Sequence, residues 1–484
     1  MKNTLRNTNC LGIFIILLLQ GLWCNGEIDN VAAMEKTEKE ALYNAIQGFV
    51  GNWWNGSYLY PDPCGWTPIQ GVSCDFLNDF WYVTDLNIGL LHDNSLTCSE
   101  NPEFRPQLFE FKHLKSLSFY NCFSSQKLIT LPTDKWANLG STLESLEFRS
   151  NPSLIGELPS TFGDLKMLQS LVIIENGFSG NLPSNIGNLR QLKRLVLSEN
   201  KFTGRIIDNL GSLTELLILD LSRNYLSGYI PFSIGYLKSL LKLDLSNNLL
   251  MGNIPDQIGN LKNLTLLDLR NNNLSGGLTQ SIEEMSSIQE IMLSSNQIGG
   301  EITKINWEKM QNLMILDLSN LGLSGEVPNS LSTLMNLRYL GLSNNVLTGN
   351  VPVDLANMPS VTSIYVDGNN LTGVLSFGLG FYRRLGRRFK AWNNPNLCYI
   401  GELMSSGYSP LGVDPCKSDE VSGLRNGSGK VQEQLVWIPA LVKSKEINPD
   451  NNSSFGLVKH GINGFGLVFM FEFFMMILLW NFIR

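Results

Sequence analysis

Asparagine is the residue whose spacing first indicates a chemical role in this chain of 484 residues. In the stretch LILDLSRNYLSGYIP, Asn224 stands between apolar residues, and an asparagine returns at the same place every 24 or 25 residues. An amide side chain both donates and accepts hydrogen bonds, so it can pair backbone groups that a coiled chain would otherwise bury unpaired. The pattern predicts a structural ladder, which Leu321 interrupts once. Its members are Asn176, Asn200, Asn224, Asn248, Asn272, Asn296, Asn345 and Asn369, and Asn151 is in phase with them.

The residues that usually perform catalysis do not form a distinctive set. Serine and aspartate recur in every repeat, and none of the three histidines, His92, His113 and His460, lies in the regular repeats. Catalysis requires a nucleophile or an acid–base pair in a pocket. We therefore expect no catalytic residue, no cofactor, no metal site and no enzyme activity. Charged residues make up 16% of the chain and the net charge is −7, which argues against nucleic acid as a partner.

The elements that carry the asparagines are predicted by the repeat LxxLxLxxNxLxGxIPxxLGxL. Segments such as Leu219-Asp220-Leu221 alternate apolar and polar residues, as half-buried strands do. A period of 24 residues is typical of leucine-rich repeats. We expect an α/β fold: a curved, right-handed solenoid of about 10–12 repeats over residues 83–373, with a parallel β-sheet on its concave face.

The repeat resembles the plant-specific class of leucine-rich repeats. The run Gly71-Val72-Ser73-Cys74 is similar to the end of the N-terminal cap in such proteins, and residues 394–398 are similar to their closing cap. The whole chain resembles plant receptor-like proteins, and most closely the Piriformospora indica-insensitive protein group. That resemblance implies a role in growth and in root responses to a beneficial fungus.

Six cysteines remain after a predicted signal peptide at residues 1–26, and they indicate disulfides in a secreted chain. Six cysteines allow 15 connectivities. Their positions at the two ends of the solenoid favour Cys64–Cys74, Cys98–Cys122 and Cys398–Cys416. These bonds would staple an N-terminal cap at residues 27–82, the first repeats, and a C-terminal cap at residues 374–416. In the N-terminal cap, Thr37-Glu-Lys-Glu40 is a capping-box signature of a helix start, and Leu42, Ile46, Phe49 and Val50 follow at helical spacing. Residues 98–112 are predicted to be either a functional surface insertion or a structural loop held by the second bond.

The C-terminal part is expected to place the solenoid outside the cell. Residues 417–463 are polar and are predicted to form a glycosylated stalk, and residues 464–484 are apolar. The apolar tail is either a membrane span or the signal for a lipid anchor. No kinase domain is expected on this chain. The predicted N-glycosylation sites are Asn55, Asn263, Asn273, Asn370, Asn426 and Asn452, and Asn451 starts an overlapping sequon.

The residues between the repeated leucines are predicted to line the concave face and to bind a protein, peptide or glycan. The chosen candidates are Arg194, Arg223, Arg270, Arg338, Tyr339 and Tyr365. Tyrosine and arginine are enriched in binding hot spots. The basic run at residues 382–390 is either a second binding surface or part of an end cap.

Two functions remain open at this stage. In the first, the protein is a membrane-anchored, extracellular receptor-like protein that acts with a partner receptor kinase. In the alternative, it is a wall-associated inhibitor of a microbial hydrolase, similar to polygalacturonase inhibitors. The hydrophobic tail favours the first, because those inhibitors lack one.

Overall fold

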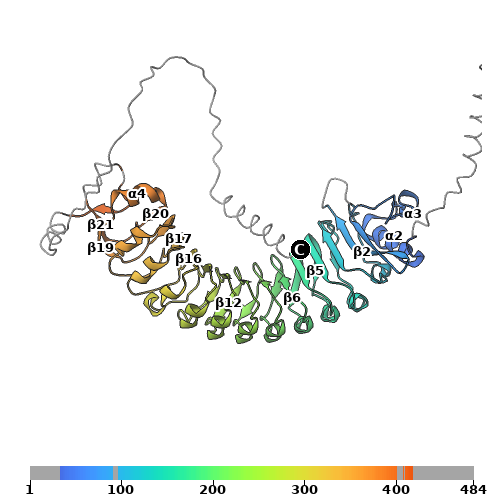
Figure 1. Ribbon diagram of the computed structural model, residues 1–484, viewed down its shortest axis with the longest axis horizontal. Helices are drawn as coiled ribbons and strands as arrows, with labels where there is room; N and C mark the ends of the chain where they lie inside the picture. The colour runs from blue at the N-terminus through green and yellow to red at the C-terminus, as the bar shows by residue number, and fades with distance from the viewer. Residues whose placement is uncertain (1–32, 91–95, 401–406, 408, 418–484) are drawn as a thin grey trace, which may run out of the picture. The chain divides into compact units, whose positions relative to one another are not determined.

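The computed structural model describes residues 33–90, 96–400, 407 and 409–417. The chain divides into two compact units, Met1–Arg425 and Asn426–Arg484, and every described residue belongs to the first. The predicted signal peptide, the apolar tail and the sequons at Asn426 and Asn452 lie outside the described residues. Within the first unit, the described residues form a solenoid that curves into an arc (Figure 1).

A long sheet lines the inner side of this arc, with short 3-10 helices on its outer side (Figure 1). In the described residues the sheet has sixteen strands. The first two strands, β1 and β2, pair antiparallel, and the other pairs are parallel. The path runs through β1 Val72–Leu77, β2 Phe80–Gly89, β3 Ser116–Tyr120, β5 Ser145–Gly156, β6 Ser170–Asn181, β7 Arg194–Val196, β9 Ile218–Asp220, β11 Lys242–Asp244, β13 Leu266–Asp268, β15 Glu290–Met292, β16 Ile315–Asp317, β17 Tyr339–Gly341, β18 Ser363–Tyr365 and β20 Phe389–Lys390, with β4 Ile129–Thr130 and β8 Lys201–Thr203 off this path.

The repeated leucines fix which side of the sheet faces the core. The middle residues of three successive strands, Leu195, Leu219 and Leu243, are completely buried. Successive side chains of a strand point to opposite faces, so the first and third residues of each strand face the concave side. From β6 onward, each strand of this path pairs with the next without a shift, as in Leu219 beside Leu243. A shift of one residue would turn every leucine outward. The predicted solenoid with a parallel concave sheet is confirmed.

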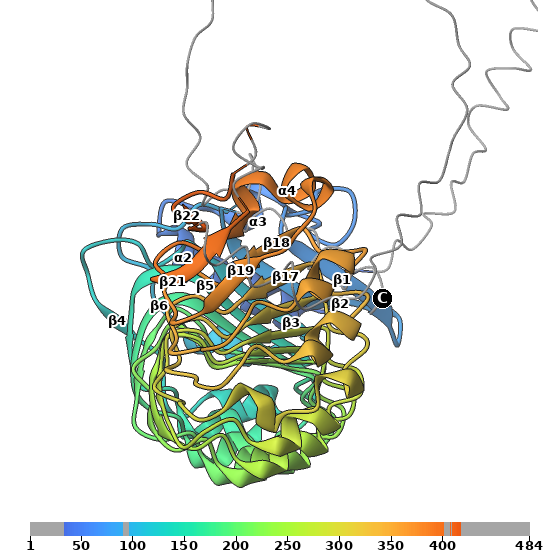
Figure 2. The ribbon, with the colours of Figure 1, turned by 90° about the vertical axis from the view of Figure 1, so that its left-hand side faces the viewer.

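The outer side of each coil is a short 3-10 helix, often preceded by proline. Pro231 has φ −70° and ψ 142° immediately before η6, a conformation that the proline ring favours. Proline precedes η3, η4, η7, η11 and η12 in the same way, and Figure 2 shows the coils stacked one behind another. Their bounds are η1 Pro106–Phe109, η2 Trp136–Leu139, η3 Ser160–Asp164, η4 Ser184–Asn188, η5 Asp208–Ser212, η6 Phe232–Tyr236, η7 Asp256–Asn260, η8 Gln280–Glu284, η9 Ile302–Lys304, η10 Trp307–Lys309, η11 Asn329–Thr333, η12 Val353–Asn357 and η13 Gly386–Arg388.

A lateral face connects the concave and outer sides, and the recurring glycine lies on it. Three short parallel strands form a second sheet there: β10 Ser227–Gly228, β12 Leu249–Gly252 and β14 Asn273–Leu274. Gly252 has φ 75°, a value that other residues rarely adopt. A Cβ at Gly252 would also lie 2.3 Å from Cδ1 of Tyr229, so the glycine makes room for a side chain of the preceding repeat.

The N-terminal cap is a helix held to the first strands by a buried carboxylate. Helix α2 spans Lys36–Val50, and the side chain of Glu35 caps it by accepting hydrogen bonds from the N–H groups of Thr37 and Glu38. The sequence predicted a capping box beginning at Thr37; the cap lies two residues earlier. Glu38 is buried, and its carboxylate accepts from the N–H groups of Val83 and Lys112. Burial raises the pKa of Glu38. A short helix, α3 Gly56–Leu59, follows α2.

Residues 98–112 belong to the structural core at this end. Leu108, Phe109 and Phe111 are buried. Arg105 reaches back to α2 and donates to the side-chain oxygen of Gln47 at 2.8 Å. The disulfide Cys98–Cys122 closes the segment. These contacts favour the structural interpretation of the segment over that of a functional insertion.

The repeat architecture continues beyond Gly373, where the sequence placed its end. Strand β20 joins the main sheet next to β18. A lateral sheet is formed by β19 Thr372–Leu375, β21 Asn396–Tyr399 and β22 Asp414–Pro415. Helix α4, Leu379–Leu385, buries Phe381 and Tyr382, and Arg384 in it donates to the carbonyl oxygens of Met358 and Ala356. The basic run therefore contributes to the end cap.

The structure pairs the six cysteines at the two ends of the solenoid. Cys64 bonds to Cys74 in the N-terminal cap, and Cys398 bonds to Cys416 behind the last repeat, with Cα atoms 5.7 and 4.9 Å apart. A solenoid exposes its apolar stack at both ends unless these ends are capped. The disulfides therefore lie where the stack most needs covalent support.

Candidate ligand-binding face

The asparagines of the repeat occupy the turn that leaves the main sheet. Asn224 is buried, and its Nδ2 donates to the carbonyl oxygens of Leu197, Leu221 and Ser222 at 2.9–3.1 Å. Its Oδ1 accepts from the N–H of Phe202 at 3.0 Å. The same pattern recurs at Asn248, Asn272, Asn345 and Asn369. The amides thus join successive coils behind the concave face and fix its strands.

Two positions of the ladder, Asn394 and Leu321, lie outside the predicted series of asparagines. Asn394, which the sequence placed only in a closing cap, makes the same bonds to Val366, Ala391 and Leu371. At Leu321, where the amide is missing, the backbone carbonyl of Leu321 itself accepts from the N–H of Gly299 at 2.8 Å. This main-chain bond joins the two coils where the ladder is interrupted.

A row of three carboxylates crosses the middle of the concave sheet. Asp220, Asp244 and Asp268 are the third residues of neighbouring strands and pair in register. The Nζ of Lys242 lies 3.2 Å from Asp220 and 3.6 Å from Asp244. The guanidinium of Arg270 donates three hydrogen bonds to the carboxylate of Asp268, the shortest of 2.6 Å. Each of these carboxylates also accepts from the N–H two residues later, which supports a structural role for the recurring aspartate.

This carboxylate row changes the acidity of its central member. Burial and, to a smaller extent, the neighbouring charges of Asp220 and Asp268 raise the pKa of Asp244 to about 7, although Lys242 opposes the shift. Strands lie about 4.8 Å apart, so three full charges in adjacent strands repel one another strongly. The middle of the concave face therefore carries less negative charge near neutral pH than its aspartates suggest.

The C-terminal end of the concave face carries an aromatic cluster in place of the carboxylates. We define it as Tyr339, Tyr365, Lys390 and Trp392. The rings of Tyr339 and Tyr365 meet edge to face with centroids 5.4 Å apart. The Nζ of Lys390 lies 3.9 Å from the centroid of Tyr365 and 5.6 Å from that of Trp392. Such cation–π contacts hold the ammonium over the rings.

Local sequence explains how this aromatic cluster fits. Gly341 stands where other repeats have aspartate, and a Cβ there would lie 2.9 Å from Cε1 of Tyr339. The glycine therefore frees space for the tyrosine ring. Burial raises the pKa of Tyr339, and the carboxylate of Asp317 reinforces the shift, so the phenol stays neutral. Tyr339 and Tyr365 remain half-buried, with part of each side chain accessible to a ligand.

The predicted arginines do not form one group. Arg194 lies half-buried in β7, where burial lowers its pKa and its Nε has no hydrogen-bond partner in the described structure. Arg223 lies at the turn after β9 and pairs with Glu199 at 3.2 Å. Arg270 is held by Asp268. Arg338 is exposed just before β17, next to the aromatic cluster. Of the arginines, Arg338 alone adjoins the predicted tyrosines in sequence.

Sequence analysis missed Lys390 and Trp392 as residues of this face. Their signal is the run Phe389-Lys390-Ala391-Trp392-Asn393-Asn394, in which Asn394 follows Asn369 by 25 residues. That spacing continues the ladder and would have placed Lys390 in the main sheet. The run lacks the usual leucines, which concealed the repeat.

The predicted glycosylation sites that the structure describes are all exposed. Asn55 caps α3 and accepts from the N–H of Tyr58. Asn263 donates its side-chain amide to the carbonyl oxygen of Lys238 at 2.9 Å. Asn273 and Asn370 lie on the lateral face, in corresponding positions of two repeats. All four are therefore accessible to a modifying enzyme.

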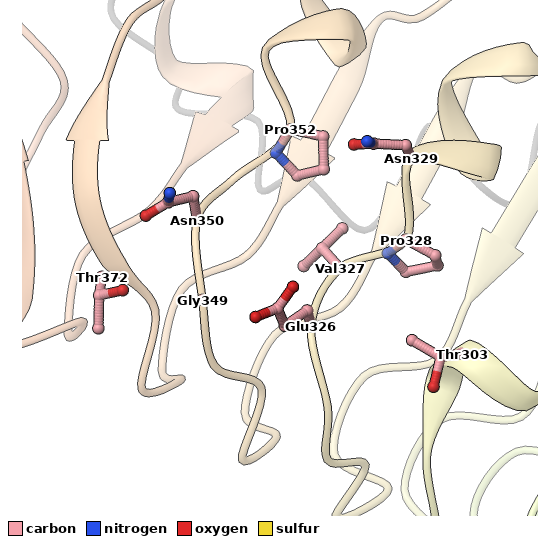
Figure 3. Close-up of a pocket in the computed structure, with 9 residues that line it drawn as sticks. All are labelled: Thr303, Glu326, Val327, Pro328, Asn329, Gly349, Asn350, Pro352 and Thr372. Atoms are coloured by element: carbon pink, nitrogen blue, oxygen red, sulfur yellow. The ribbon is translucent and has the colours of Figure 1, made fainter. Parts of the chain in front are cut away.

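A shallow depression lies on the lateral side near the C-terminal end (Figure 3). Its walls come from neighbouring coils, and Glu326 is their one ionisable residue. The lining residues are Thr303, Glu326, Val327, Pro328, Asn329, Gly349, Asn350, Pro352 and Thr372. A single carboxylate with no adjacent base or nucleophile does not form a catalytic arrangement.

The described residues contain neither a group of metal ligands nor a membrane-spanning helix. Within them, no group of three or more histidine, cysteine or acidic residues is placed to hold a metal ion. No helix in this part of the chain has both the length and the apolar character that crossing a bilayer requires. The predicted tail at residues 464–484 lies outside the described residues.

Comparison with known sequences identifies the repeats. Residues 94–227 match the family described as leucine-rich repeat region, and residues 239–261, 263–285 and 309–371 match leucine-rich-repeat families. Over 172 residues the chain is 62% identical to Piriformospora indica-insensitive protein 2 of Arabidopsis thaliana. The chain is a plant leucine-rich-repeat protein. This match covers 34% of the chain and 40% of that relative, so it spans less than half of either.

A second relative of this leucine-rich-repeat protein is Receptor like protein 29 of Arabidopsis thaliana. The two are 35% identical over 180 residues, which is 36% of this chain and 37% of the relative.

Solved structures of plant leucine-rich-repeat ectodomains are similar to this chain in fold. The ectodomain of the Arabidopsis thaliana receptor kinase GASSHO1/SCHENGEN3, in complex with CASPARIAN STRIP INTEGRITY FACTOR 2, has a TM-score of 0.55 and 28% identity over 76% of this chain and 48% of that one. The plant peptide hormone receptor RGFR1 in complex with RGF2 has a TM-score of 0.51 and 26% identity, covering 69% and 60%.

Proposed function

We propose that this leucine-rich-repeat protein is a cell-surface receptor-like protein that binds an extended peptide on its concave face. The repeats present a continuous sheet whose outward residues differ from strand to strand. A surface of this kind binds an extended ligand along many strands and needs no deep pocket. The similar plant peptide hormone receptor RGFR1 was solved in complex with RGF2, and the similar ectodomain of GASSHO1/SCHENGEN3 in complex with CASPARIAN STRIP INTEGRITY FACTOR 2, which supports a peptide as the ligand class.

The aromatic cluster carries the proposal. Tyr339 and Tyr365 are half-buried and rigidly packed, and they lie beside Lys390 and Trp392. Rigid aromatic side chains with polar tips contribute large contact areas at low entropic cost, as interface hot spots do.

We further propose that signalling proceeds through a partner receptor kinase at the plasma membrane. This part of the proposal is supported by the relationship to Receptor like protein 29. The identity with Piriformospora indica-insensitive protein 2 supports a role in root responses to microbes and in growth. The polar stalk and apolar tail predicted from the sequence would hold the solenoid at the outer surface of the membrane.

A capture experiment tests the proposal. The full chain, produced in plant cells and kept in mild detergent, is exposed to apoplastic fluid and membranes from fungus-colonised roots. The double variant Tyr339→Ala/Tyr365→Ala is compared with Tyr236→Ala, which truncates an exposed ring on the outer helix η6. We expect the wild type and the control to retain the same peptides and a receptor kinase, and the double variant to lose the peptides.

Two results would contradict the proposal. Equal retention of every peptide by all three proteins would show that the aromatic cluster does not contribute to binding. Retention of a microbial hydrolase without peptides or a kinase would instead favour the alternative of a wall-associated inhibitor.

A further inference from the structure

The lateral face carries an exposed apolar patch in the middle of the solenoid. We define the lateral patch as Tyr225, Tyr229, Leu249 and Met251, whose exposed fractions are 54, 61, 57 and 45%. The neighbouring strands β10 and β12 pair in register, with Ser227 beside Leu249. Tyr229 extends over Gly252 and so reaches the strand that carries Met251. The four side chains therefore form one continuous surface.

A contiguous apolar surface of this kind is usually covered in a soluble domain. The adjacent strand supplies a specific candidate for the cover. Asn273 begins the sequon Asn273-Leu274-Ser275 and pairs in register with Met251 across β12 and β14. Paired residues on neighbouring strands lie about 5 Å apart. A sugar attached to Asn273 would therefore start beside the lateral patch.

The side chain of Asn273 is also oriented for attachment. Its Oδ1 accepts a hydrogen bond from Nε2 of Gln297 at 2.9 Å. Within the described residues, no hydrogen bond engages its Nδ2, the atom that carries an N-linked glycan. The bond from Gln297 fixes the amide plane without using the nitrogen.

A smaller apolar surface precedes a second sequon in the solenoid. Val346 is 56% exposed, and Asn370, which begins another sequon, follows it by 24 residues. The backbone N–H of Asn370 donates to the carbonyl oxygen of Leu347. At the corresponding position of the lateral patch, the N–H of Leu249 donates to the carbonyl oxygen of Leu226. Asn263 differs, because the residue 24 positions earlier is Ser239 and its own Nδ2 donates to Lys238.

We infer that an N-linked glycan on Asn273 lies along the lateral face and covers the lateral patch, and that a glycan on Asn370 covers Val346 in the same way. The inference depends on entry into the secretory pathway and not on the proposed ligand. A lipid-linked oligosaccharide is the sugar donor. The bond between its first sugar carbon and the pyrophosphate oxygen breaks, the bond from that carbon to Nδ2 forms, and the amide proton is released to a base. The lipid pyrophosphate leaves.

The test uses the full chain secreted by plant cells. Glycopeptide mapping measures occupancy of Asn273, and a fluorescent dye that binds exposed apolar surface reports the state of the lateral patch. Ser275→Ala removes the sequon but keeps Asn273, Ser275→Thr preserves the sequon, and Asn263→Gln removes a sequon whose counterpart one repeat earlier is the polar residue Ser239. We expect dye binding to rise roughly two-fold in Ser275→Ala alone, because only that change uncovers a large apolar patch.

A second variant separates this effect from misfolding. Adding Leu249→Ser and Met251→Ser to Ser275→Ala should lower dye binding part of the way back to the wild-type value, since only Tyr225 and Tyr229 of the lateral patch then remain apolar. An unmodified Asn273 would overturn the inference. So would dye binding in Ser275→Ala that equals the wild-type value, or that does not fall in the triple variant.

Discussion

The side-chain oxygen of Asn248 accepts a hydrogen bond from the backbone N–H of Leu226, one repeat earlier, at 3.0 Å. Its nitrogen donates to the carbonyl oxygens of Leu221, Leu245 and Ser246. One buried side chain thus pairs four backbone groups that water cannot reach. The concave face depends on this ladder, because the turn that Asn248 holds determines where the next strand begins.

Replacing Asn248 by leucine is expected to destabilise the solenoid. The change leaves buried backbone groups without partners, at a cost of about 1–3 kcal/mol or more. Asn260→Leu is the matched control, since Asn260 is exposed at the end of η7, and it should change stability by less than about 0.5 kcal/mol. Urea denaturation measures both. Equal midpoints for the two variants would show that the ladder does not stabilise the fold.

Stability is expected to fall as pH rises through neutrality because of Asp244. Its pKa is raised from 3.8 to about 7 in the folded state, so the folded protein holds a proton that the unfolded chain has already released. The stabilisation is complete below about pH 4 and is lost as pH rises through about 7, by on the order of 2–4 kcal/mol. Melting temperatures measured from pH 5 to 8 report this loss.

Two variants test whether Asp244 is the cause. Asp244→Asn is neutral at every pH and should flatten the decline, chiefly by raising stability at pH 8. Asp208→Asn removes an exposed carboxylate on η5 and should leave the decline unchanged. If Asp244→Asn retains the wild-type dependence on pH, the carboxylate row does not contain the titrating group.

Gly252→Ala and Gly277→Ala should differ in cost although both glycines have positive φ. Alanine is strained at either position, by about 1 kcal/mol. At Gly252 the new Cβ also collides with Tyr229, and this overpacking adds about 1–3 kcal/mol to the loss of stability. At Gly277 no atom lies within 4 Å of the new Cβ. Chemical denaturation should therefore rank Gly252→Ala as the less stable. Adding Tyr229→Ala should recover part of the loss; no recovery would argue against the contact.

The sequence was sufficient to predict the solenoid, because its signal is repeated about ten times. Each repeat places leucines, an asparagine and a glycine at fixed positions. Leucine fills the core, asparagine pairs the backbone of the turn, and glycine allows neighbouring coils to approach closely. The cap at α2 was also predictable from its apolar spacing. The start of this helix was predicted two residues too late, because Glu35 and not Thr37 supplies the capping oxygen.

The candidate binding surface was harder to predict because it depends on departures from the repeat. Tyr339 and Tyr365 were identifiable since they break the aspartate pattern. Lys390 and Trp392 are concealed because the last repeat lacks its leucines, and the sequence does not show that Asp268 holds Arg270. Such pairings depend on side-chain positions across neighbouring strands, which no single repeat encodes.

Site-specific photo-crosslinking tests most directly whether the aromatic cluster binds a ligand. A photoreactive aromatic residue replaces Tyr365 in the full chain at the surface of plant cells, and the same residue replaces Tyr236 on η6 in a matched protein. After irradiation with apoplastic fluid present, the crosslinked peptides are sequenced. The proposal predicts a defined peptide attached at position 365 and absent at position 236. No crosslink at 365, or identical crosslinks at both positions, would contradict it.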